Sequence, residues 1–90
     1  MRPLLPPFAL ALLAACNGAL APDPALRSRQ EAACRAVIAA HIGRSPGEVV
    51  AEWVSETAGV AQVAARDGDR LHVCEVDGAG RVLGYMHPGG

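Results

Sequence analysis

The chain has 90 residues, enough for one small domain, with a formal net charge of −1 at pH 7, three cysteines and 3% aromatic residues. Every basic residue is an arginine, and no basic stripe interleaved with aromatic side chains occurs along the sequence. The sequence therefore lacks the basic surface that nucleic-acid-binding proteins usually carry, and we expect no nucleic-acid partner.

The first 15 residues have the pattern of an export signal. Met1-Arg2 gives a positive start, and the stretch from Pro3 to Ala15 contains no charged residue. That stretch of about 13 residues is shorter than the roughly 20 that a membrane-spanning helix needs. We therefore predict that residues 1–15 direct the rest of the chain out of the cytoplasm.

The sequence Leu13-Ala14-Ala15-Cys16 resembles the lipobox of bacterial lipoproteins. In that family the cysteine thiol receives a lipid, and a dedicated signal peptidase cleaves just before it. The resemblance implies lipid attachment at Cys16 and anchoring of the chain in a membrane of the cell envelope. An aspartate after the cysteine often signals inner-membrane retention, so Asn17 favours the outer membrane, facing the periplasm.

Two alternatives to lipidation remain open. Ordinary secretion to the periplasm would use cleavage after Ala19-Leu20-Ala21, although Pro22 would then occupy the disfavoured first mature position. The other alternative is an uncleaved start.

Residues 16–23 are predicted to form a tether, and residues 24–90 a small domain. Asp23 and Pro24 predict a helix start, with the aspartate as N-cap and the proline at the first helical position. Ala-rich sequence predicts a helix from Ala25 to Ile42, which Gly43 would end. At 100° per residue, one side of this helix collects a mostly apolar stripe with Cys34 near its centre. The stripe consists of Leu26, Gln30, Ala33, Cys34, Val37, Ile38 and His41.

After Pro46-Gly47, β-branched residues alternate with short Gly-containing breaks, which predicts four strands joined by hairpins. The predicted strands are Val49 to Thr57, Val60 to Arg66, Arg70 to Asp77 and Arg81 to Met86. The expected fold class is α+β, with one N-terminal amphipathic helix packed on an antiparallel four-stranded meander.

Alternation along the strands indicates which side chains share a face. In the first strand Val49, Ala51 and Trp53 form the more probable core face. In the third strand His72, Cys74 and Val76 share one face, but both faces carry apolar residues, so alternation alone does not decide which one is solvated.

Cys34 and Cys74 are the two cysteines left if Cys16 carries a lipid. An exported chain meets oxidising conditions, so we predict a disulfide between them that joins helix to sheet. Free thiols are one alternative. The other is a metal site made by Cys34, His41, His72 and Cys74, whose spacings match no recognised structural-zinc pattern. The prediction is therefore no bound metal and no cofactor.

No pattern of catalytic residues occurs in the sequence, so we expect a non-catalytic binding protein. The stretch Glu48 to Tyr85 resembles the PepSY type of domain, through Gly47-Glu48-Val49-Val50 at the first strand and the Asp77-Gly78-Ala79-Gly80 turn near the close. That resemblance implies regulation of a peptidase. The chain also resembles small exported two-cysteine proteins of Gram-negative bacteria, which have no established role. The alternative function is a structural or accessory envelope lipoprotein that docks on a protein partner.

Overall fold

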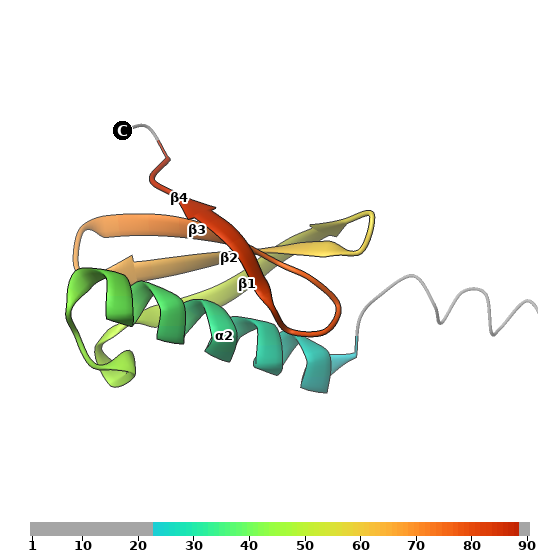
Figure 1. Ribbon diagram of the computed structural model, residues 1–90, viewed down its shortest axis with the longest axis horizontal. Helices are drawn as coiled ribbons and strands as arrows, with labels where there is room; N and C mark the ends of the chain where they lie inside the picture. The colour runs from blue at the N-terminus through green and yellow to red at the C-terminus, as the bar shows by residue number, and fades with distance from the viewer. Residues whose placement is uncertain (1–22, 89–90) are drawn as a thin grey trace, which may run out of the picture.

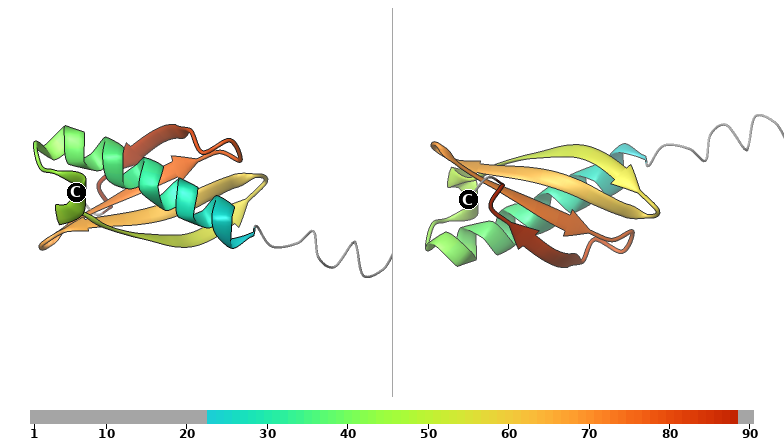
Figure 2. Two further views of the ribbon diagram at one scale, coloured as in Figure 1. Left: turned by 90° about the horizontal axis from the view of Figure 1, so that it is seen from below. Right: turned by 90° about the horizontal axis from the view of Figure 1, so that it is seen from above.

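The computed structural model of the protein describes residues 23–88. One helix, α2 (Pro24–Ile42), lies across one face of a four-stranded sheet, and a short 3-10 helix, η2 (Pro46–Glu48), connects the two (Figures 1 and 2). The predicted α+β fold class is confirmed. Within residues 23–88, no helix is both long and apolar enough to cross a membrane. Cys16 and the predicted signal and tether up to residue 22 lie outside the described residues.

Local signals set both ends of α2. The Asp23 carboxylate accepts a hydrogen bond from the backbone N–H of Leu26 at 2.8 Å, and Pro24 occupies the first helical position. Gly43 ends the helix with φ of +73°, a left-handed conformation that glycine adopts without steric cost. The predicted helix is therefore confirmed at both ends.

The sheet is an antiparallel meander in the order β1-β2-β3-β4. Its strands are β1 (Val50–Thr57), β2 (Val60–Asp67), β3 (Arg70–Val76) and β4 (Val82–Met86). Ala58 and Gly59, between β1 and β2, both have positive φ, as a two-residue turn of type I′ requires. Asp77 organises the turn before β4, where its carboxylate accepts hydrogen bonds from the N–H groups of Ala79 and Arg81.

The core lies between α2 and the inner face of the sheet. The buried apolar cluster comprises Cys34, Ile38, Ala39, Val49, Val63, Ala65, Cys74 and Val76. Cys34 and Ile38 belong to the predicted helical stripe. At 100° per residue Ala39 lies on the opposite side of the helix, yet it is buried as well. Ala39 is buried because the chain turns back after the helix. The Arg44 N–H donates to the Ala39 carbonyl, and Val49 joins the same cluster.

Polar side chains in the first half of α2 bind β1 and the β3–β4 turn. The buried Gln30 side chain donates to the Asp77 carbonyl at 3.0 Å and accepts from the Trp53 indole N–H at 2.9 Å. The Glu31 carboxylate accepts from the Trp53 backbone N–H at 2.8 Å. The Arg27 guanidinium lies 4.1 Å from the centre of the Trp53 ring, a cation–π contact. These contacts fix the N-terminal half of the helix on the sheet.

A disulfide joins Cys34 of α2 to Cys74 of β3, with a Cα–Cα distance of 5.9 Å. Both cysteines are fully buried in the core cluster. The predicted pairing of these two residues is confirmed, and the bridge attaches the middle of the helix covalently to an interior strand.

Candidate metal centre formed by three histidines

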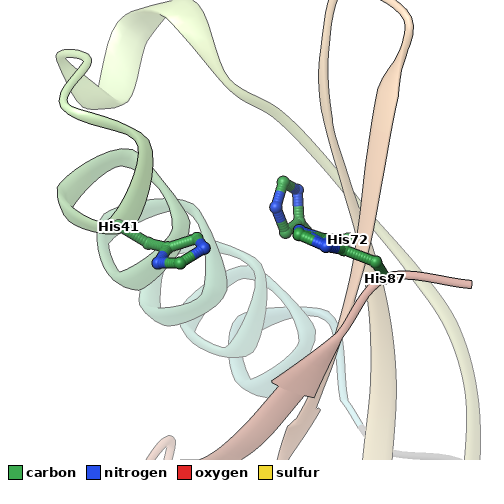
Figure 3. Close-up of side chains that lie close together, drawn as sticks. All are labelled: His41, His72 and His87. Atoms are coloured by element: carbon green, nitrogen blue, oxygen red, sulfur yellow. The ribbon is translucent and has the colours of Figure 1, made fainter. Parts of the chain in front are cut away.

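The C-terminal end of α2 meets the start of β3 and the end of β4 at a cluster of imidazoles. All three histidines of the chain, His41, His72 and His87, take part (Figure 3). One ring nitrogen from each lies within 4.8 Å of the corresponding nitrogens of the other two. We call this group the histidine cluster.

Each histidine is positioned by a different element. His41 lies in the last turn of α2, two turns after Cys34, so both side chains project from the same side of the helix. His72 lies on β3 two residues before Cys74, and therefore on the same inner face. Because Val73 pairs with Met86, continuing the antiparallel register by one residue brings His87 opposite His72.

His72 is the buried member of the cluster, with only 1% of its surface exposed, whereas His41 and His87 are exposed. Neither ring nitrogen of His72 has a hydrogen-bond partner among the described residues. Buried polar atoms in native proteins are almost always satisfied, so an orphaned imidazole needs an explanation. The His87 ring centre is 4.1 Å from that of His72, and the His41 ring centre is 5.7 Å away. The orphaned imidazole therefore lies beside two other imidazoles.

The electrostatic environment keeps His72 neutral. Burial is the largest cause that lowers the pKa of His72 below its ordinary value of 6.5, because desolvation penalises the imidazolium form. Positive charge on His87, His41 and Arg70 acts in the same direction, and Asp67 opposes it. A neutral imidazole is the form that donates a lone pair to a metal ion, so no proton has to be displaced from His72 at neutral pH.

The three nitrogens lie farther apart than the ligands of a bound metal ion. Tetrahedral zinc with Zn–N bonds of about 2.0–2.1 Å places its nitrogen ligands roughly 3.3 Å apart. The cluster, at up to 4.8 Å, has to contract by rotation of its side chains. His41 and His87 are exposed, whereas His72 is buried, so their side chains are the ones with room to rotate toward an ion.

The structure brings together two of the four residues considered for a metal site from the sequence. His41 and His72 meet, but Cys34 and Cys74 are joined in the disulfide and offer no thiolate. The third nitrogen comes from His87, which sequence reasoning missed. The reason is a one-residue register shift between Glu75 and Val76: symmetric pairing outward from the turn would set Met86 opposite His72, whereas the shifted register sets His87 there.

The outer face of the sheet, away from α2, presents a second feature. It carries exposed apolar side chains, Val50 and Val54 on β1 and Leu83 and Met86 on β4. A shallow hollow on this face is lined by Gln62, Val73, Glu75, Gly84, Tyr85 and Met86. The hollow combines apolar side chains, among them Val73 and Met86, with the polar side chains of Gln62 and Glu75.

Searches of protein-family models, of curated proteins and of solved structures find no match to this chain.

Proposed function

We propose that this chain is a non-catalytic envelope protein whose folded domain binds a divalent transition-metal ion through His41, His72 and His87. The observation that carries the proposal is the buried His72 imidazole, which lacks a hydrogen-bond partner and faces two further imidazoles. A metal ion would supply the missing partner of His72 and draw in the two exposed rings.

The donor set defines the class of metal. Three imidazoles, with no carboxylate among the described residues close enough to join them, suit zinc, copper, nickel or cobalt. Magnesium and calcium require oxygen ligands and are not expected to bind. Because His41 and His87 are exposed, an ion bound above His72 would keep at least one coordination position open to solvent.

Zn²⁺ titration of untagged protein, in competition with a chromophoric chelator, tests the proposal. We expect binding of one ion per chain. Replacing His72 by alanine removes one of only three ligands. The loss of affinity should therefore exceed the roughly 10–100-fold that removal of an outer-sphere partner causes in metal proteins. His41→Ala and His87→Ala should also weaken binding strongly.

Glu75→Ala provides the matched control, because Glu75 is an exposed potential ligand on the opposite face of the sheet. It should bind Zn²⁺ as the wild type does. Wild-type protein that binds no ion, or a set of histidine variants with unchanged affinity, would contradict metal binding at the cluster.

We also propose that the protein is exported and lipid-anchored through Cys16, as the lipobox resemblance implies. Fatty-acid labelling in cells should give a labelled chain for the wild type and none for Cys16→Ala, since the thiol is the site of attachment. Cys16→Ala should also retain the unprocessed mass. Labelling that persists in this variant would exclude Cys16 as the anchor.

A second candidate function, binding of an envelope protein, is favoured by the exposed apolar side chains of the outer sheet face. In the PepSY-like form of this proposal the partner is a peptidase. Crosslinking in intact cells should then recover a peptidase with the wild type. Leu83→Glu, which places a charge on that face, should recover much less of it. Equal recovery with both proteins would argue against this surface.

A further inference from the structure

We propose that the Cys34–Cys74 disulfide sets the metal affinity of the histidine cluster, so that reduction of this bond releases the ion. The inference rests on the metal binding proposed above and concerns the regulation of that same site. It derives from the position of the bridge relative to the three histidines.

The disulfide and the histidine cluster link the same two elements. Cys34 and His41 lie on α2 two turns apart, about 10 Å along the helix axis. Cys74 and His72 are alternate residues on the same face of β3, about 7 Å apart along the strand. The bridge therefore limits how far α2 can move from β3, at a point two helical turns from His41 and two residues along the strand from His72.

The hydrogen-bonded links between helix and sheet lie away from the cluster, where α2 contacts the sheet through the His41 ring against His72 and Tyr85. The side-chain hydrogen bonds that described residues of α2 make to the sheet and its connections come mainly from Gln30, Glu31 and Arg35. They end on Trp53, Asp77 and Val49, none of which belongs to β3 or β4. The Cys34–Cys74 bond is the covalent link that holds the helix against β3.

Reduction removes this constraint without supplying another. A dithiol reductant gives two electrons and two protons, the Sγ–Sγ bond breaks, Cys34 and Cys74 become thiols, and the reductant becomes a disulfide. The C-terminal half of α2 then holds its place on β3 by apolar packing and by the ring contact between His41 and His72. Binding of one ion by three imidazoles then has to restore the alignment of α2 on β3. The free energy that this costs lowers the affinity for the ion.

Thermodynamic linkage requires the reverse effect. If reduction weakens Zn²⁺ binding by a given factor, bound Zn²⁺ must stabilise the disulfide against reduction by the same factor. A tenfold change in affinity corresponds to about 30 mV in the potential of a two-electron couple. The two effects can be measured separately.

The test compares three forms of the untagged chain: oxidised wild type, wild type reduced and then desalted under anaerobic conditions, and Cys34→Ala/Cys74→Ala. The double variant lacks the cross-link and also any thiolate ligand. Zn²⁺ affinity is measured by chelator competition, and circular dichroism establishes which forms are folded. We expect binding weaker by on the order of tenfold or more in both unbridged forms, because preorganisation is lost.

A folded double variant with the affinity of the oxidised wild type would overturn the proposal. So would tighter binding by the reduced wild type, with sulfur-to-metal charge-transfer bands in its Co²⁺ complex, because the thiols would then have replaced the histidines as ligands. Failure of the oxidised wild type to bind Zn²⁺ is a different result, which removes the proposed function itself.

If the double variant does not fold, the effect of bound Zn²⁺ on the disulfide of the wild type provides the test instead. Saturating Zn²⁺ should lower the midpoint potential of the disulfide, measured at equilibrium in a thiol–disulfide buffer, by about 30 mV for a tenfold coupling, and His87→Ala should show no such shift. Equal midpoint potentials for zinc-free and zinc-saturated wild type would overturn the proposal.

Discussion

Replacing Cys34 and Cys74 together by alanine is expected to lower the free energy of unfolding by about 4 kcal/mol, although the replacement removes no charged group. The two cysteines are 40 residues apart in sequence, and closing a loop of this size restricts the unfolded chain by roughly that amount. A domain this small gains only about 3–5 kcal/mol from its core alone, so the bridge contributes about as much stability as the core does.

Urea denaturation of the oxidised wild type, the reduced wild type and the double variant measures this effect. The two unbridged forms should agree with each other, since both lack the cross-link. A difference from the oxidised protein smaller than about 1 kcal/mol would show that strain in the bridge offsets its effect on the unfolded chain.

Replacing His72 by leucine is expected to abolish metal binding and at the same time to make the metal-free protein more stable. An unsatisfied buried polar group costs about 1–3 kcal/mol, and leucine fills a similar volume without a polar atom. Denaturation in the presence of a chelator should show a gain of about 1 kcal/mol. His41→Leu is the control, because His41 is exposed and its replacement leaves metal-free stability nearly unchanged.

The pH dependence of stability provides an independent check on His72. Its pKa in the folded protein lies below the ordinary value of 6.5, mainly because of burial, so the unfolded chain binds a proton more readily. The contribution of His72 to stability is fully present above pH 6.5 and is lost as the pH falls toward the folded-state pKa. The wild type should therefore lose more stability than His72→Leu between pH 7 and pH 5. Parallel curves would indicate that His72 is not the titrating group.

A gain in stability on removing His72 would have a functional meaning. Polar residues that cost stability in a core are retained where they act, and a metal ligand is one such role. In the metal-free protein, His72 then lowers the stability of the core but remains available as a metal ligand. Measuring both properties on one variant tests this directly.

The sequence by itself determined the elements and their order. Asp23, Pro24 and Gly43 act within one or two turns of the chain, so the ends of α2 could be predicted without knowledge of the rest. The glycine-containing turns imposed antiparallel hairpins for the same local reason. The pairing of Cys34 with Cys74 followed from removing Cys16 from the count, and the fold places the two at bonding distance.

The tertiary structure alone decided which face of the sheet is buried and which side chains meet on it. Both faces of β3 carry apolar residues, so alternation could not choose between them. Docking of α2 through Cys34 buried His72 and left Val73 on the outer side. His41, His72 and His87 are separated by 31 and 15 residues in the chain. Their convergence depends on strand register and helix placement together, which no local pattern encodes, because both are set by the packing of the whole domain.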